Sequence, residues 1–202
     1  MNKKKTIAVA IVLALVLLIG GMLAFFTDTD TKTNVFVLGD VDISLSEETW
    51  ESNGINEANG ILPGASAQKD PVITNDSDTL PAYVFCEVIV PCYDSDDTDE
   101  VSYAPLFTLN DIGTGWNLMS TTPDNDNKTI TYVYNYGTAS AMTSLAANAS
   151  TPAVFSSVTL VDTLTSAQKD TAPSNTNIVV NAYGIQTTEL GVTTPSDIFD
   201  LF

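Results

Sequence analysis

The sequence contains no histidine and no arginine. Without an imidazole there is no Ser-His-Asp or Cys-His nucleophile and no HExxH zinc helix. Without a guanidinium there is no bidentate clamp for phosphate or carboxylate. Lys69 and Lys169 each lie in the tetrapeptide AQKD, which is typical of an exposed turn. We therefore expect that the chain is not an enzyme and holds no organic cofactor.

Cysteine is also scarce: Cys86 and Cys92, in FCEVIVPC, are the only two. If this run is one strand, the thiols share a face but lie about 20 Å apart. A disulfide needs Cα atoms about 4.4–6.8 Å apart. We expect two buried thiols; a disulfide is the alternative if the chain bends back at Pro91.

Positive charge is rare and gathers at the start of the chain. Three of the seven lysines are Lys3, Lys4 and Lys5, and an apolar run follows from Ile7. A basic segment, an apolar segment and a small residue together indicate a secretory signal peptide. We expect residues 1–24 to be removed by cleavage between Ala24 and Phe25. The alternative is a retained membrane anchor, because the run to Phe26 is about long enough to span a bilayer.

Cleavage would leave an unusually acidic protein. The signal takes three lysines and no acid, so residues 25–202 keep 25 acids and four lysines, a net charge of −21. This charge repels nucleic acid and anionic lipid, so we expect neither as a partner, and a membrane contact only before cleavage. The length of residues 25–202 fits a single domain with its own core.

The mature part alternates short β-branched and aromatic runs with turn-forming clusters such as NDSDTLP and TPDNDN. Many short strands without long helices between them favour a sandwich over a βαβ fold. The strands are expected at 34–38, 41–45, 70–74, 82–90, 129–136, 153–160 and 178–186. Short helices are expected over 139–149 and in the SAQKD region, and the C-terminal PSDIFDLF is expected to form a helical turn or a last strand.

One acidic loop suggests calcium. The segment YDSDDTDEVSY supplies five carboxylates as candidate ligands: Asp94, Asp96, Asp97, Asp99 and Glu100. Alternating oxygen ligands suit Ca²⁺, but an EF-hand needs Gly at its sixth position and Glu at its twelfth. Counted from Asp94, those positions hold Asp99 and Pro105. A solvated acidic loop without an ion is therefore the favoured alternative.

The N-terminal region resembles the TasA/camelysin family of exported bacterial and archaeal proteins. The family pattern, an aromatic–Thr–Asp segment followed by spaced Asn, Phe, Gly and aliphatic residues, is matched at Ala24, Phe25, Phe26, Thr27, Asp28, Asn34, Phe36, Gly39, Val41, Ile43, Leu45 and Glu47. Further resemblance lies in LPGASAQKDPVITNDSDTLPAYVFCEVIV, AVFSSVTL and VVNAYGIQTTEL.

The resemblance implies an all-β, jelly-roll-like antiparallel β-sandwich with one or two short helices, preceded by a signal peptide that a SipW-type signal peptidase cleaves. It implies a secreted protein of the extracellular (biofilm) matrix or cell surface of a prokaryote, forming fibres with itself or with related matrix subunits. Some members are labelled metallo-endopeptidases. That activity does not transfer here, because histidine-based zinc ligation is impossible and no thiolate cluster replaces it.

A candidate assembly strand follows the cleavage site. Residues 25–33 place four threonines on one face by period two, Thr27, Thr29, Thr31 and Thr33, with Asp28 on the other. Such a segment can pair with a neighbour's open sheet edge while Phe25 or Phe26 fills a pocket. Two alternatives remain: the segment folds back on its own sandwich or stays loose, or the protein is a monomeric cell-surface adhesin or a module that binds a cation or another ligand.

Overall fold

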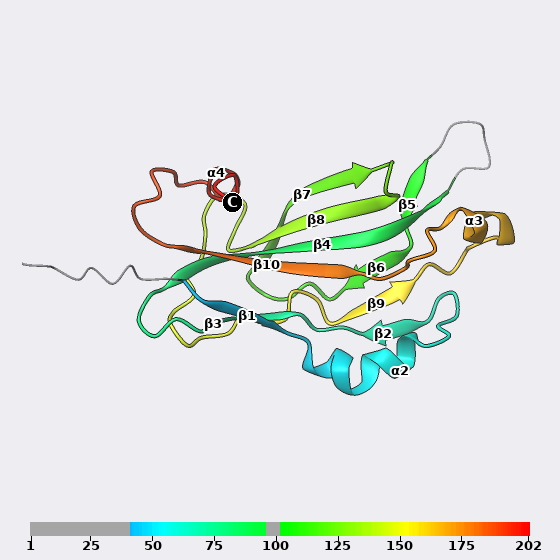
Figure 1. Cartoon of the computed structure of the whole chain (residues 1–202), viewed down its shortest axis with the longest axis horizontal. Coiled ribbons are helices and arrows are strands. Elements are labelled where there is room, and N and C mark those ends of the chain that lie inside the picture. The colour runs from blue at the N-terminus through cyan, green and yellow to red at the C-terminus, as the bar shows by residue number, and fades with distance from the viewer. Residues whose placement is uncertain (1–40, 96–101) are drawn as a thin grey trace, which may run out of the picture. The chain divides into compact units, whose positions relative to one another are not determined.

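Strands dominate the computed structural model, which describes residues 41–95 and 102–202 (Figure 1). The strands are β1 (Ile43–Ser46), β2 (Ser66–Gln68), β3 (Val72–Asn75), β4 (Ala82–Asp94), β5 (Tyr103–Pro105), β6 (Phe107–Asn110), β7 (Trp116–Asp124), β8 (Thr129–Tyr136), β9 (Ser157–Leu160) and β10 (Val179–Gln186). The helical segments are η1 (Trp50–Gly54), α2 (Ile55–Ala58), α3 (Ser166–Thr171) and α4 (Pro195–Phe199). The expected all-β class is confirmed.

The first layer is an antiparallel sheet in the order β10-β4-β8-β7, and β5 pairs with the end of β4 (Figure 1). Its central strand explains the core. Val84, Cys86, Val88 and Val90 alternate along β4 and are fully buried on one face. Glu87 lies on the other face and is half-buried, as the alternation predicts.

The second layer combines the two-stranded sheet β1-β3 with the three-stranded sheet β2-β9-β6. Between the named strands, residues 66–75 continue to pair with residues 148–160: Thr151 N donates to Ile73 O at 2.9 Å and Val154 N to Pro71 O at 2.8 Å. Ile73, Phe155 and Val158 from this layer pack against the inner face of β4. The two layers thus form the antiparallel sandwich.

The C-terminal helix α4 covers part of the outer face of the first layer. Phe85 on β4 is fully buried, with its ring 5.2 Å from Phe199 and 6.0 Å from Phe202. Tyr183, which pairs with Phe85 across the β10–β4 ladder, contacts the same two rings. Thr194 caps α4 by accepting a hydrogen bond from Asp197 N, so PSDIFDLF begins as a capped helical turn and is not a last strand.

Two sequence-based expectations are wrong. Residues 139–149 are not helical, because their backbone pairs elsewhere: Leu145 and Ala82 exchange hydrogen bonds, and Met142 bridges to Gly137. Lys69 does not lie in an exposed turn, because it is 5% exposed and faces inward. The expected strand 34–38 lies outside the described residues.

The two thiols are confirmed as free and fully buried. Cys86 and Cys92 lie on the single strand β4, which continues through Pro91 without folding back. Burial raises the pKa of Cys86 to about 12, with a further contribution from the negative charges of Glu47 and Glu87. Burial also raises the pKa of Cys92 to about 11.

Candidate functional site

The residues singled out in the sequence fall largely outside the described parts of the chain. This holds for the cleavage and assembly residues 24–33 and for Asp96, Asp97, Asp99 and Glu100. Asp94 is described, and its Oδ1 accepts a hydrogen bond from Ser102 N. Within residues 41–95 and 102–202, no group of three His, Cys, Asp or Glu side chains is placed to hold a metal ion. The calcium site stays a prediction.

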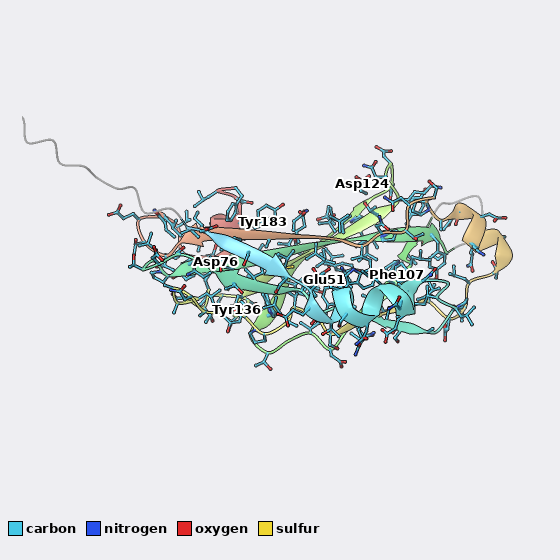
Figure 2. The ribbon with its side chains drawn as sticks, turned by 60° about the horizontal axis from the view of Figure 1, so that its bottom comes forward. Glu51, Asp76, Phe107, Asp124, Tyr136 and Tyr183 are labelled. Carbon is cyan, nitrogen blue, oxygen red and sulfur yellow. The ribbon has the colours of Figure 1, made fainter. Side chains whose placement is uncertain are left out.

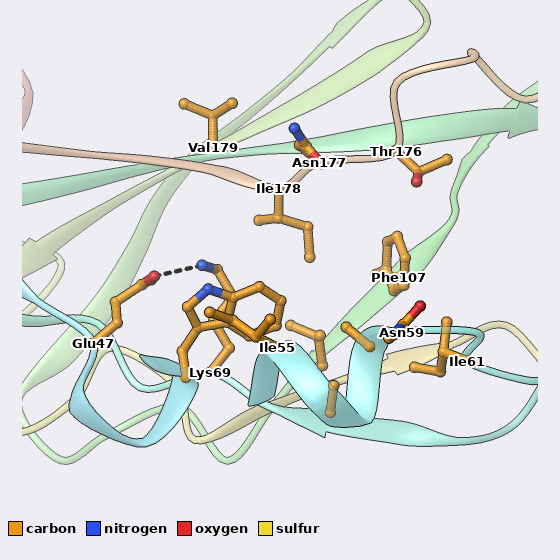
Figure 3. Close-up of a pocket in the computed structure, with 14 residues that line it drawn as sticks. Glu47, Ile55, Asn59, Ile61, Lys69, Phe107, Thr176, Asn177, Ile178 and Val179 are labelled. Carbon is orange, nitrogen blue, oxygen red and sulfur yellow. Dashed lines mark hydrogen bonds and ion pairs between the residues drawn. The ribbon is translucent and has the colours of Figure 1, made fainter. Parts of the chain in front are cut away.

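A pocket of about 680 Å³ opens beside η1 and α2 (Figure 3). One wall comes from η1, α2 and β2, and the opposite wall from the segment that leads into β10. Its lining consists of Glu47, Trp50, Ile55, Ala58, Asn59, Ile61, Ala67, Lys69, Phe107, Val158, Thr176, Asn177, Ile178 and Val179. The volume is within the range of small-molecule sites.

A buried ion pair forms the polar end of this pocket. Lys69 Nζ lies 2.7 Å from Glu47 Oε2, and the two side chains are only 7% and 18% exposed. The same ammonium lies 4.8 Å from the centroid of the Trp50 ring, in cation–π contact. The other oxygen, Glu47 Oε1, is buried and has no hydrogen-bond partner among the described residues.

The pair forms because two neighbouring side chains between β2 and β3 hold the segment before η1. Lys69 binds Glu47, while the next residue, Asp70, accepts hydrogen bonds from Thr49 N at 3.0 Å and Trp50 N at 3.2 Å. Asp70 thereby satisfies amides at the start of η1, where a helix lacks internal acceptors. Local anchoring thus fixes the carboxylate against the ammonium.

Glycine allows the helical segment to lie directly on β2. A Cβ on Gly54 would sit 2.0 Å from Gln68 O, so no larger residue fits there. Further along, Glu57 Oε2 accepts a hydrogen bond from Gln68 N at 2.7 Å. These contacts fix the wall of the pocket that carries Ile55.

The burial of Lys69 can be predicted from the alternation of side chains along residues 67–75. The buried positions Ala67, Lys69, Pro71, Ile73 and Asn75 follow period two. If residues 67–75 are extended throughout, Lys69 lies on the same face as the apolar residues Ala67, Pro71 and Ile73. The strand predicted from the sequence begins at Asp70 and therefore excludes Lys69.

A second concave surface of about 690 Å³ lies where the outer face of β4, β7 and β8 meets α4. Glu87 lines it, but Glu87 Oε1 already accepts hydrogen bonds from Asn181 Nδ2 at 2.9 Å and Tyr183 OH at 3.3 Å (Tyr183 is labelled in Figure 2). Its acceptor is occupied within the protein. The pocket with the unpartnered Glu47 oxygen is therefore the better candidate site.

Comparison with known proteins bears on the same part of the chain. Residues 1–98 match the sequence model of the camelysin metallo-endopeptidase family, and this span includes Glu47, Lys69 and both cysteines. The match covers just under half of the chain, and over this span the sequence is similar to the camelysin family. No curated protein and no solved structure matches.

The camelysin family description names a metallo-endopeptidase, whereas this sequence has no histidine. The described residues offer no metal-binding group of acids and cysteines in its place. That this chain is not an enzyme stays a prediction. In the described part of the chain, no helix is long and apolar enough to cross a membrane.

Proposed function

We propose that this chain is an exported structural subunit of a prokaryotic extracellular matrix, which assembles into fibres with itself or with related subunits. The TasA/camelysin family relation and the antiparallel sandwich support this proposal. A structural subunit requires a stable fold, a soluble surface and exposed strand edges. It does not require a catalytic group.

The observation that carries the proposal is a pair of strand edges on the same side of the sandwich. Among the described strands, β10 pairs only with β4, and β1 pairs only with β3. The two edges meet at Gly184, where a Cβ would lie 2.8 Å from Ile43 Cγ2. An unpaired edge is a template for a strand from another chain.

The mechanism begins with export. A SipW-type signal peptidase cleaves between Ala24 and Phe25 and frees residues 25–33. This segment adds to an edge of the next subunit through backbone hydrogen bonds, with Phe25 or Phe26 filling a pocket. Because each subunit donates to the next in a head-to-tail contact that does not close, the product is a filament.

Electron microscopy of truncated protein tests the proposal. Mature protein beginning at Phe25 is expected to form fibres in negative stain, and protein lacking residues 25–33 is expected to stay monomeric. A second variant keeps residues 25–33 but carries Phe25→Ala and Phe26→Ala. It retains the backbone hydrogen-bonding groups and lacks the aromatic rings, so it is expected to form fewer fibres. Unchanged fibres from the truncated protein would refute the donor-strand mechanism.

A monomeric ligand-binding module is the second candidate, and the pocket beside Lys69 is the observation that favours it. Mature protein that remains monomeric under all conditions, yet binds a small ligand saturably, would favour this candidate. Hydrolysis of casein that a chelator abolishes would instead support the peptidase activity named for the family.

A further inference from the structure

The pocket beside η1 and α2 has a wide apolar body. Ile55 on α2 and Ile178 before β10 line opposite walls, and Phe107 closes the far side (Figure 3). The mouth is apolar as well, because Ile55 is 53% and Val179 is 44% exposed. Large apolar side chains exposed around a cavity are typical of binding sites.

Its polar end is electrically neutral but has unused hydrogen-bonding capacity. Lys69 carries three N–H donors, and one of them bonds Glu47 Oε2. Glu47 Oε1 is a buried acceptor without a partner among the described residues. Because this oxygen is shielded from solvent, the polar atoms offered to a ligand are Lys69 Nζ and Glu47 Oε2, whose residues both line the cavity.

We infer that this pocket binds an amphiphile with an apolar chain and an uncharged hydroxyl head. The hydroxyl donates its hydrogen to Glu47 Oε2 and accepts a hydrogen bond from Lys69 Nζ, while the chain lies between Ile55 and Ile178. One hydroxyl group can both donate and accept, which matches the donor and the acceptor that the ion pair presents side by side. The chemistry is shared by free fatty alcohols and by the glycerol head of acylglycerols.

Charge excludes the other head groups. A second ammonium beside Glu47 would lie within a few ångströms of the Lys69 ammonium, and like charges repel strongly in a partly buried site. A carboxylate would oppose Glu47 and a chain whose formal net charge is −18. The uncharged head avoids both costs. This inference does not depend on fibre formation.

Tryptophan fluorescence gives a direct binding assay. Trp50 lines the pocket, and the only other tryptophan, Trp116, is buried elsewhere with its Nε1 donating to Pro152 O. We expect saturable fluorescence changes with 1-octanol, and an affinity that rises about fourfold per methylene from 1-hexanol to 1-octanol. Octylamine and octanoate at pH 7 are expected to bind at least about tenfold more weakly. Comparing the affinity for 1-octanol with that for 1-monooctanoylglycerol shows whether the free alcohol or the acylglycerol binds more tightly. Saturable binding of either compound supports the inference.

Two surface variants locate the site. Ile55→Ser, at the exposed mouth, is expected to weaken 1-octanol binding at least about fivefold by removing apolar contact. Leu118→Ser is the matched control, since Leu118 is 48% exposed on β7, outside the pocket, and its replacement is expected to leave binding unchanged. Calorimetry on the Trp50→Phe variant checks the binding without the fluorescent reporter.

Several results would overturn the inference: no saturable binding of 1-octanol or 1-monooctanoylglycerol, equal weakening by Ile55→Ser and Leu118→Ser, or tighter binding of octylamine or octanoate. A synthetic peptide of residues 25–33 that changes Trp50 fluorescence where both hydroxyl compounds do not would also overturn it. That last result would assign the pocket to an assembly contact, so failure here is distinguishable from failure of the fibre proposal.

Discussion

At the scale of single residues, one pentapeptide occurs twice with opposite outcomes. Ser-Ala-Gln-Lys-Asp at 66–70 begins as strand β2 and buries its lysine, whereas the same residues at 166–170 form helix α3 with an exposed lysine. Intrinsic propensity is identical in the two copies. The neighbouring residues must therefore decide which structure forms.

The flanking residues differ in ways that explain both outcomes. Thr165 caps α3, because its side chain accepts from Gln168 N while Gln168 Oε1 accepts from Thr165 N. The first copy has Ala65 at that position and is followed by Pro71, which disfavours a helical conformation at Asp70. Pairing with β9 then stabilises the extended form.

The two lysines make a matched pair of variants. Lys69→Met leaves the partly buried Glu47 carboxylate without its partner, so we expect a loss of about 2–4 kcal/mol in the free energy of unfolding. Lys169→Met removes an exposed charge and is expected to change it by less than about 0.5 kcal/mol. Urea denaturation of both variants measures the difference.

A double variant separates packing from charge. Lys69→Met with Glu47→Leu removes both charges, and we expect it to regain most of the lost stability because no unpaired charge remains. Equal stability of the two single lysine variants would show that Glu47 and Lys69 do not act as a buried pair.

The thiols give a second residue-level prediction. A pKa raised to about 12 at Cys86 and about 11 at Cys92 keeps both thiols protonated at pH 8. Only the thiolate reacts with alkylating reagents, and both side chains are fully buried. Mass spectrometry is expected to find no iodoacetamide adduct on native protein and two on protein unfolded in urea. Rapid labelling of the native protein at pH 8 would contradict the buried strand β4.

At the scale of elements, one carboxylate at the end of β7, Asp124, accepts the hydrogen bonds of the loop between β7 and β8 (Figure 2). Asp124 accepts from Asn127 Nδ2 at 2.7 Å, Asn127 N at 2.9 Å and Asp126 N at 3.0 Å. The hydrogen bond from the Asn127 side chain, then those from the two backbone amides, lower the pKa of Asp124 below its ordinary value. These bonds form an Asx-type turn that sets the loop.

The sign of the pH effect follows from that lowered pKa. The hydrogen-bonded carboxylate stabilises the fold above its ordinary pKa of 3.8, and this contribution is lost as the pH falls through the lowered pKa of the folded state. NMR titration is expected to find Asp124 below its ordinary value, and Asn127→Ala is expected to raise it towards that value. An unchanged pKa in the variant would show that Asn127 does not hold the carboxylate.

The C-terminal helix offers a packing prediction at the same scale. Ile198 is 1% exposed, so Ile198→Ala is expected to cost about 2–4 kcal/mol. Phe202 is 53% exposed, and Phe202→Ala is expected to cost clearly less although its ring contacts Phe85. Chemical denaturation measures both variants. A larger loss for Phe202→Ala would contradict the described packing of α4.

The sequence predicts elements where periodicity is strong. The expected strand 129–136 coincides with β8, and the alternation in 82–90 identifies most of β4. The shorter strands β2, β5 and β6 offer too few residues for a period, and β7 ends in exposed threonines and Pro123. Residues 139–149 have helical composition, but tertiary pairing with Ala82 overrides it.

At the scale of the whole molecule, the amino-acid composition excludes classes of catalytic site more readily than it locates a binding site. The missing histidine and the family resemblance are read from sequence directly. The pocket is not, because Glu47, Lys69 and Ile178 come from distant segments that only the sandwich brings together. The ion pair also requires the Lys69 side chain to point into the protein, and a predicted strand that begins at Asp70 does not indicate this.

The central claim is that residues 25–33 of one subunit pair with another subunit. The most direct test places a photo-reactive phenylalanine analogue at position 26 and assembles an equal mixture of ¹⁵N-labelled and unlabelled mature protein. After illumination, mass spectrometry identifies the isotope on each half of every cross-linked peptide. We predict mixed-isotope cross-links that join position 26 to β1 or β10 of another chain. Cross-links only within one isotope would show that the segment folds back on its own sandwich, and would contradict the account.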